Sequence, residues 1–243
     1  MHPSSLMRYF WERSRRSVSL FMVGVCITFF VGTGALTALR IVDRQVLMSC
    51  LGLSYPGIFD HLWLFQFLTA PLLHANVTHL LFNMLSLWML GPDVEQVLGK
   101  KRYVLFSGVC AIASMSGFLL LDHGRGQIVL GYSGVIFGIL VAQARYFPDK
   151  RIYVYFFPVK MKNAVLILGA VELYLSIAPE EGGTIAHAAH VFGALSAYGM
   201  ISLWRWQSLR GSLLGKMAPP AAVVLDKRPL RRNSFRLDIP DKL

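Results

Sequence analysis

The chain has 243 residues, of which 55% are hydrophobic and only 15% are charged, and its formal net charge is +11. A soluble domain carries about 25% charged residues, so this composition indicates an integral membrane protein and argues against a soluble one. The basic residues separate long apolar runs instead of gathering on one polar face, which also argues against a nucleic-acid-binding protein.

Uncharged stretches recur along the chain at or near the length of about 20 residues that a helix needs to cross the hydrocarbon core of a bilayer. The long uncharged run from His61 to Pro92 exceeds one helix, so its first part is assigned to an outer loop that begins at Arg40. Six spans are expected, at 17–39, 72–90, 103–121, 131–144, 163–177 and 184–203. The sequence therefore predicts an all-α membrane protein built as a bundle of six transmembrane helices.

The distribution of lysine and arginine predicts the topology. With six spans and a cytoplasmic N-terminus, all but three of the 24 basic residues, Arg40, Arg44 and Arg125, fall on the cytoplasmic side, as the positive-inside rule requires. The first span could instead be a signal peptide, but its uncharged core is longer than a typical signal core. We expect a cytoplasmic segment at 1–16, a membrane domain at 17–205, and a disordered basic cytoplasmic tail at 206–243 that is drawn to anionic lipid.

The three cysteines do not form a recognisable pattern. Cys26 and Cys110 lie within apolar runs, and Cys50 is distant from both. This spacing favours packing roles over a disulfide framework or a zinc site.

Polar side chains inside a bilayer are costly and therefore mark candidate functional sites. The expected spans contain seven: His74, His79, Asn83, Ser133, Glu172, His187 and His190. Counted from the cytoplasmic end of each helix at about 1.5 Å per residue, Ser133 and His79 lie roughly 18 Å and His190 roughly 22 Å above the inner boundary. In a core about 30 Å thick, that common level lies about 10 Å below the outer surface, where a water-filled cavity could reach it.

These residue types at one depth indicate nucleophilic catalysis. A serine hydroxyl needs a base to accept its proton, and His190 matches Ser133 in depth. His79 and Asn83 are spaced i, i+4 on one helix face, so both can donate hydrogen bonds to a developing oxyanion. Ser133 also stands near a helix start, where free backbone N–H groups favour an anion.

Small residues predict a close approach of the two helices that carry Ser133 and His190. Gly134 and Gly138 are spaced four apart on one helix, and Gly193 and Ala197 are spaced likewise on the other. Such spacing lets membrane helices pack backbone to backbone.

Four motifs in this order resemble the rhomboid family of intramembrane serine proteases. They are HANVTHLLFN (74–83), GPDVEQVLG (91–99), GYSG (131–134) and AHVFG (189–193), and the resemblance covers roughly residues 65–198. It implies a six-helix bundle that cleaves membrane-protein substrates through an acyl-enzyme without a cofactor or metal. It further implies a catalytic dyad and an oxyanion hole, with Ser133 as nucleophile, His190 as general base, and His79, Asn83 and the Ser133 backbone N–H as oxyanion donors. The supporting residues are His74, Phe137, Gly131, Gly134 and Gly193.

Some positions depart from the common pattern of that family. Phe65 and Gln66 stand where many members have Trp-Arg, which puts the anchoring of the outer loop in doubt. Phe137 replaces a frequent tyrosine, so its ring can stack on His190 but offers no hydroxyl. Ala197 replaces a second glycine.

Other interpretations of the same residues remain open. His187 could serve as the base, although it lies about one turn closer to the outer surface. Glu172 is expected to pack or to form hydrogen bonds, because its helix should flank the site and no acid is expected at the level of the serine. Four histidines, His74, His79, His187 and His190, could instead hold a metal, but the zinc-protease signature is absent.

A bundle of this kind could also act without catalysis, as a transporter or as a membrane chaperone that binds client proteins. As an enzyme, it would open its site to the outer side of a bacterial inner membrane. We expect the helix at 163–177 and the loop APEEGGT (178–184) to move when substrate enters.

Overall fold

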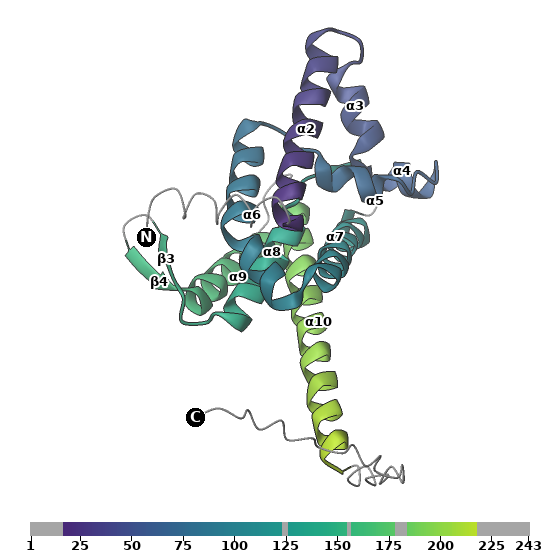
Figure 1. Cartoon of the computed structure of the whole chain (residues 1–243). Helices are drawn as coiled ribbons and strands as arrows, with labels where there is room; N and C mark the ends of the chain where they lie inside the picture. The colour runs from purple at the N-terminus through teal and green to yellow at the C-terminus, as the bar shows by residue number, and fades with distance from the viewer. Residues whose placement is uncertain (1–16, 123–125, 155–156, 178–183, 218–243) are drawn as a thin grey trace, which may run out of the picture. The chain divides into compact units, whose positions relative to one another are not determined.

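The computed structural model describes residues 17–122, 126–154, 157–177 and 184–217, which are mostly helical (Figure 1). The long helices are α2 (Val18–Ala38), α6 (Val77–Leu98), α7 (Lys100–Asp122), α8 (Ser133–Tyr146), α9 (Met161–Ile177) and α10 (Thr184–Met217). Short helices and strands connect them: α3 (Arg44–Leu51), β1 (Leu53–Ser54), α4 (Tyr55–Phe59), α5 (Gln66–Thr69), the 3-10 helix η1 (Ala70–Leu72), β2 (Ile128–Val129), β3 (Arg151–Val154) and β4 (Phe157–Lys160). The chain divides into two compact units, Met1–Trp204 and Arg205–Leu243, and the first contains the elements from α2 to α9 together with α10 as far as Trp204.

A helix lies at each of the six expected spans. Among the described residues, α2 and α7 are long and apolar enough to cross a membrane by length and composition. Large hydrophobic side chains are exposed along several of the helices, including Phe21, Phe82, Leu105 and Leu166. Exposed apolar surface of this extent is expected of a face that contacts lipid.

Two helices extend beyond the ranges expected from the sequence. Helix α6 continues past Leu90 to Leu98, and Gly99 after it has a φ of 74°, which glycine adopts more readily than other residues. Helix α10 continues to Met217, so the expectation of an irregular tail from residue 206 is wrong for 206–217. No proline occurs between 184 and 217, and Pro219 is the first that would end the helix. Residues 218–243 of the expected tail lie outside the described residues.

The core lies where α6 packs against α2, α7 and α8. Its buried side chains include Leu87, Phe106 and Ile139. Cys26 and Cys110 are buried in the same cluster, and all three cysteines are free. The predicted packing role of Cys26 and Cys110 is therefore confirmed.

The loop between α2 and α6 is tied directly to the segment that leads into α8. Strands β1 and β2 pair antiparallel, with Leu53 opposite Val129 and Ser54 opposite Ile128. The backbone N–H of Gly131 also donates to the carbonyl of Ala70 at 2.9 Å. The loop between α2 and α6 therefore holds the start of α8.

Gln66 anchors this loop, which removes the doubt raised by the Phe65-Gln66 pair. Its buried amide nitrogen donates to the carbonyls of Ser49 and Cys50, each at 3.1 Å. Its amide oxygen accepts from the Ser54 N–H at 3.2 Å. A neutral amide that both donates and accepts thus joins three backbone groups of the loop.

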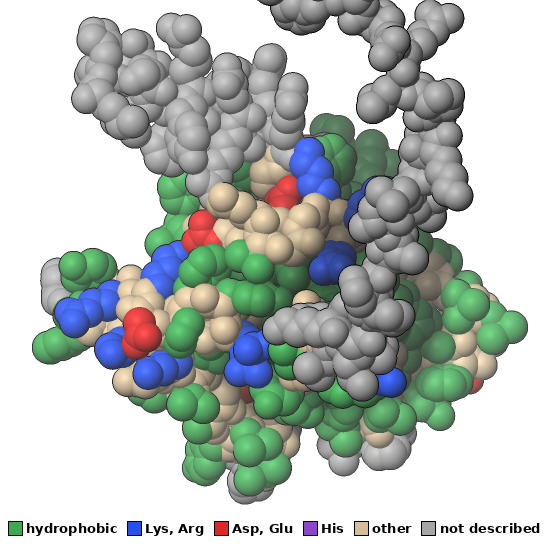
Figure 2. Space-filling view, turned by 60° about the horizontal axis from the view of Figure 1, so that its bottom comes forward, with side chains coloured by type: hydrophobic (Ala, Val, Ile, Leu, Met, Phe, Trp, Pro, Cys, Tyr) green, Lys and Arg blue, Asp and Glu red, His purple; other side chains and the backbone are tan. Residues whose placement is uncertain are grey.

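On the face drawn in Figure 2, basic side chains lie dispersed among hydrophobic ones. The β3–β4 hairpin carries some of these basic residues. Nζ of Lys160 in β4 lies 2.9 Å from Oδ1 of Asp149, just before β3. Nearby, Lys150 binds Asp93 of α6 at 2.6 Å. Hydrogen bonding to Lys160 lowers the pKa of Asp149, as do the charges of Lys160 and Lys162.

Candidate functional site

Ser133 is the first residue of α8, and the turn before it depends on Gly131. Gly131 has a φ of 113°, a backbone conformation that residues with a side chain rarely adopt. A Cβ on Gly131 would also lie 2.8 Å from Nε2 of His79. Glycine at this position therefore turns the chain into α8 and lets the His79 imidazole approach that turn.

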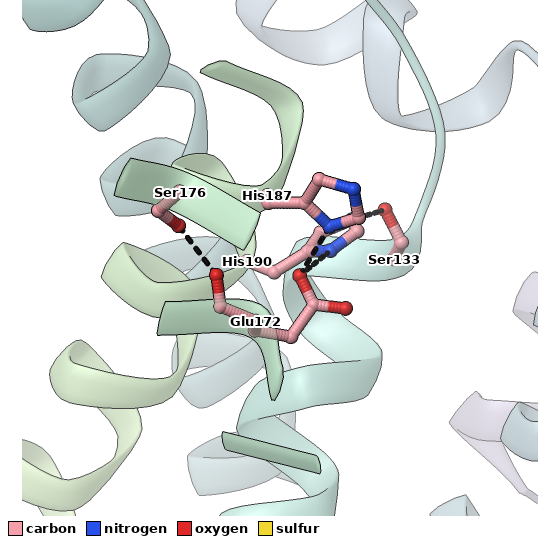
Figure 3. Close-up of polar contacts among 5 residues, drawn as sticks. All are labelled: Ser133, Glu172, Ser176, His187 and His190. Atoms are coloured by element: carbon pink, nitrogen blue, oxygen red, sulfur yellow. Dashed lines mark hydrogen bonds and ion pairs between the residues drawn. The ribbon is translucent and has the colours of Figure 1, made fainter. Parts of the chain in front are cut away.

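Ser133 and His190 are in hydrogen-bond contact. Nε2 of His190 lies 2.7 Å from Oγ of Ser133 (Figure 3). The two helices meet at glycines, because a Cβ on Gly193 would collide with the carbonyl oxygen of Gly134, and a Cβ on Gly138 would lie 3.3 Å from that of Ala197. This is the close approach that the small-residue spacing predicts, and it brings a hydroxyl of α8 and an imidazole of α10 together.

The carboxylate of Glu172 lies on the other side of the His190 ring. Its Oε2 is 2.9 Å from Nδ1 of His190 and 2.8 Å from Nδ1 of His187 (Figure 3). The expectation that no acid reaches the level of the serine is therefore wrong. Helix α9 packs against α8 and presents Glu172 toward the site. His187, the alternative base, contacts this carboxylate, whereas His190 contacts the serine.

Asn83 is a buried donor without a partner in the described part of the chain. Asn83 is 5% exposed, and its side-chain amide nitrogen has no hydrogen-bond acceptor among the described residues. The same nitrogen lies 3.8 Å from the position of a Cβ on Gly131, close to the turn before Ser133. An unused donor at this place can receive an acceptor from outside the protein.

The sequence model of the Rhomboid domain matches residues 61–206 of the chain, more than half of its length. The chain belongs to the rhomboid family. It is 27% identical over 179 residues to the Rhomboid protease GlpG of Enterobacter sp. (strain 638), which covers 72% of this chain and 58% of that protein. It is 31% identical over 146 residues to the Rhomboid protease GlpG of Pectobacterium atrosepticum, covering 59% of this chain and 49% of that protein.

A mitochondrial relative, Rhomboid protein 1 of Saccharomyces cerevisiae, is 29% identical over 126 residues, which is 50% of this chain and 36% of that protein. The chain thus spans about half the length of the relatives it matches. Membership of the rhomboid family identifies an integral membrane protein and supports intramembrane proteolysis by a serine hydrolase.

The four histidines of this rhomboid do not form one cluster. His74 is buried, its Nδ1 lies 3.2 Å from the carbonyl of Leu72, and its ring is 5.1 Å from that of His79. His187 and His190 instead share Glu172. In the described part of the chain, Glu172, His187 and His190 have ligand atoms within 4.8 Å of one another, close enough to hold a metal ion. The proposed four-histidine site is therefore wrong, and any metal would compete with the hydrogen bonds to Glu172.

Phe137 lies one turn after Ser133 and stacks on the ring of His190. The ring centroids are 4.5 Å apart and the planes differ by 12°. The stacking predicted from the sequence is therefore present, and it orients the imidazole without a hydroxyl.

The contact of Glu172 with both histidines is the feature that sequence reasoning missed in this rhomboid. Two signals were present: Glu172 is the sole acid within an expected span, and His187 and His190 share a helix face at i, i+3. Neither signal gives the rotation of α9 about its axis, which decides where the carboxylate points. The loop APEEGGT lies outside the described residues except for its last residue.

Proposed function

We propose that the chain is an intramembrane serine endopeptidase with Ser133 as nucleophile and His190 as general base. The observation that carries the proposal is the 2.7 Å contact between Oγ of Ser133 and Nε2 of His190. An unassisted serine hydroxyl is a poor nucleophile, and an imidazole within hydrogen-bond reach is the usual way to activate it. Membership of the rhomboid family supports the same reaction.

The reaction proceeds in two stages. Oγ of Ser133 attacks the scissile carbonyl as Nε2 of His190 takes the hydroxyl proton, and His190 then donates that proton to the leaving amine. The product of this stage is an ester between Ser133 and the substrate. Water, deprotonated by the same Nε2, hydrolyses the ester and restores the serine.

Three donors stabilise the negative charge that develops on the carbonyl oxygen. The backbone N–H of Ser133 lies in the first turn of α8, where N–H groups have no helical partner. The Asn83 amide is an unused buried donor, and the ring of His79 lies against the same turn. Fixed donors in a site of low dielectric are worth more than they are in water.

The substrate is a transmembrane or juxtamembrane segment of another membrane protein. A substrate helix must unwind before a carbonyl reaches Ser133, because its own hydrogen bonds cover that carbonyl. We propose that the six long helices, α2 and α6 to α10, form one bundle whose membrane domain is residues 17–205, with both termini in the cytoplasm. The site then opens to the outer side of a bacterial inner membrane, and substrate enters beside α9. No cofactor takes part.

The test is a comparison in liposomes. The full chain and its Ser133→Ala variant are each reconstituted with a single-span substrate labelled at both ends, and fragments are quantified by gel fluorescence. Cleavage by the wild type and none by Ser133→Ala is expected. Cleavage by Ser133→Ala at the wild-type rate would overturn the proposal. Sensitivity to EDTA with indifference to serine-directed phosphonates would favour a metalloenzyme instead, and a cellular function retained in a Ser133→Ala, His190→Ala double variant would favour a chaperone.

A further inference from the structure

A carboxylate from α9 contacts the catalytic candidate His190 on the side opposite Ser133. The side chain of Glu172 is 13% exposed, against 20% for His190 and 31% for His187. A charged group so far from water needs hydrogen-bond partners. In the described part of the chain, the imidazoles of His187 and His190 are hydrogen-bond partners of this carboxylate.

We propose that Glu172 is a positioning residue that sets the tautomer and orientation of His190, and that His187 tunes it through the same carboxylate oxygen. The proposal rests on the proposed function of Ser133 and His190. It adds an acid that the expected serine and histidine dyad lacks.

The chemistry of the donor and acceptor sets the tautomer. An ionised carboxylate accepts hydrogen bonds and donates none, so the proton between Oε2 and His190 sits on Nδ1. A neutral imidazole carries one proton, and its Nε2 therefore presents a lone pair to Oγ of Ser133. The contacts at 2.9 and 2.7 Å on opposite sides of the ring together hold the form of His190 that can act as a base.

The same contact acts when His190 becomes charged. Once Nε2 has taken the serine proton, the Nδ1–H of the imidazolium points at a carboxylate and is stabilised by it. The proton stays on His190, and Glu172 remains ionised, as in serine protease triads. The carboxylate thus stabilises the charge that forms during attack.

His187 shares Oε2 with His190, so the two rings compete for one negative charge. Their centroids are 6.0 Å apart and their planes are nearly perpendicular, at 86°. His187 also faces solvent more than His190 does. A proton on His187 offsets part of the negative charge of Glu172. The carboxylate then stabilises the protonated form of His190 less.

The other groups around His190 are few. Helix α8 contributes the hydroxyl of Ser133 and the ring of Phe137, and α6 contributes His79, which interacts electrostatically with His190. Helix α9 contributes Glu172, and α10 contributes His187. Among the described residues with these contacts, Glu172 therefore supplies the negative charge.

The experiment compares Glu172→Gln, Glu172→Asp and His187→Ala with the wild type, as full chains in liposomes, by the pH dependence of substrate cleavage. Glu172→Gln is expected to lower cleavage roughly a hundredfold and to move the acidic limb of the pH profile to lower pH. This loss is smaller than the roughly 10⁴-fold effect known for the acid of a triad, because Phe137 also holds the ring. Glu172→Asp should recover part of the rate.

His187→Ala is expected to move the acidic limb in the opposite direction, to higher pH, with a rate within about tenfold of the wild type, since a single carboxylate hydrogen bond matters modestly. The matched control is Ser176→Ala. It removes the 2.6 Å bond from Ser176 Oγ to the backbone carbonyl of Glu172 without touching either histidine, and it should cleave like the wild type. Thermal unfolding of each variant checks that the fold is retained.

Two outcomes would overturn the proposal. In the first, Glu172→Gln matches the wild type in rate and pH profile while Ser133→Ala is inactive, so that Glu172 has no role although the proposed function stands. In the second, EDTA abolishes wild-type cleavage and Zn²⁺ restores it, so that the three residues hold a metal. Cleavage by Ser133→Ala would instead overturn the proposed function itself.

Discussion

The carboxylates of Glu95 and Glu172 both lie within residues 61–206, which match the Rhomboid domain, and they differ in the groups that donate hydrogen bonds to them. Glu95 of α6 accepts hydrogen bonds from the start of α2, from the hydroxyls of Ser17 and Ser19 and from the backbone N–H groups of Val18 and Ser19, at 2.7 to 3.0 Å. We call this set the Glu95 clamp. Glu172 accepts from two imidazoles that can gain and lose protons.

The comparison shows how the same side chain serves stability at one place and chemistry at another. In the Glu95 clamp, the donors are neutral groups that do not titrate, and the carboxylate also lies at a helix N-terminus, where negative charge is favoured. Around Glu172 the donors are the rings of His187 and His190, and Asn83, beside the turn that leads to Ser133, is left without an acceptor in the described part of the chain. We therefore expect changes in the clamp to alter stability and changes around Ser133 to alter the rate.

The largest expected effect is that of Asn83→Ala. Removing one oxyanion donor lowers kcat by roughly 10²- to 10³-fold. Because the amide nitrogen is buried and unpaired among the described residues, its removal should leave the unfolding temperature unchanged or raise it. Cleavage kinetics measure the expected loss of kcat, and thermal unfolding of the same preparation measures the unfolding temperature. A large loss of stability with kcat retained would place Asn83 in the structural class with Glu95.

The next largest effect is expected for Gly193→Ala, a loss of roughly a hundredfold in kcat/KM. The added Cβ collides with the carbonyl oxygen of Gly134, which separates α8 from α10, and a misplacement of about 1 Å can cost about that much. Gly169→Ala is the matched control, since a Cβ there meets no atom within 4 Å. Equal rates for the two variants would show that the approach of these helices does not limit the reaction.

Glu95→Gln should lower the free energy of unfolding by about 2 kcal/mol, because hydrogen bonds to a charged acceptor are lost. Its kcat/KM per folded molecule should match the wild type. Thermal unfolding in detergent and cleavage at a temperature well below the transition measure the two quantities. A reduced kcat/KM in the folded protein would break the distinction between the two carboxylates.

The clamp also predicts a dependence of stability on pH. Burial raises the pKa of Glu95, but the hydrogen bonds from Val18, Ser19 and Ser17 lower it, and the net pKa lies below its ordinary value of 4.5. A lowered pKa adds stability above the unfolded value, and that stability is lost as the pH falls through the folded value. The gap in unfolding temperature between the wild type and Glu95→Gln should therefore be full at neutral pH and shrink below pH 4.5. A constant gap would contradict this account.

Phe137→Ala has the smallest expected effect, a loss of about three- to tenfold in kcat/KM. Stacked aromatic rings contribute about 0.5 to 1.5 kcal/mol, and here the stacking holds the ring of His190. Phe137→Tyr keeps the ring and should cleave like the wild type. If Phe137→Ala is as active as Phe137→Tyr, the contacts with Ser133 and Glu172 alone hold His190.

The depth of the polar residues in their helices could be predicted from the sequence. The direction in which their side chains point could be predicted only in part. Counting residues from helix ends placed Ser133 and His190 at similar depths, and small residues predicted that their helices touch. Depth follows from the helical rise, which is the same in every helix. The direction of a side chain depends also on helix rotation, and for Glu172 that is fixed by the packing of α9 on α8.

Helix ends and loop anchors were less predictable for a related reason. The charged residues after Leu90 ended the predicted span, but α6 continues to Leu98, and Glu95 on it binds the start of α2. Family comparison cast doubt on Gln66, but its buried amide binds the backbone of Ser49, Cys50 and Ser54. In both cases the decisive partner lies far away in the sequence.

The most direct test of the central claim is covalent labelling of the serine. The full chain in liposomes is treated with a fluorophosphonate, and the modified peptide is located by mass spectrometry in the wild type, His190→Ala and Glu95→Gln. An adduct on Ser133 is expected in the wild type and in Glu95→Gln, and little or none in His190→Ala. An unmodified Ser133 in the wild type, or equal labelling without His190, would contradict the proposed roles of Ser133 and His190.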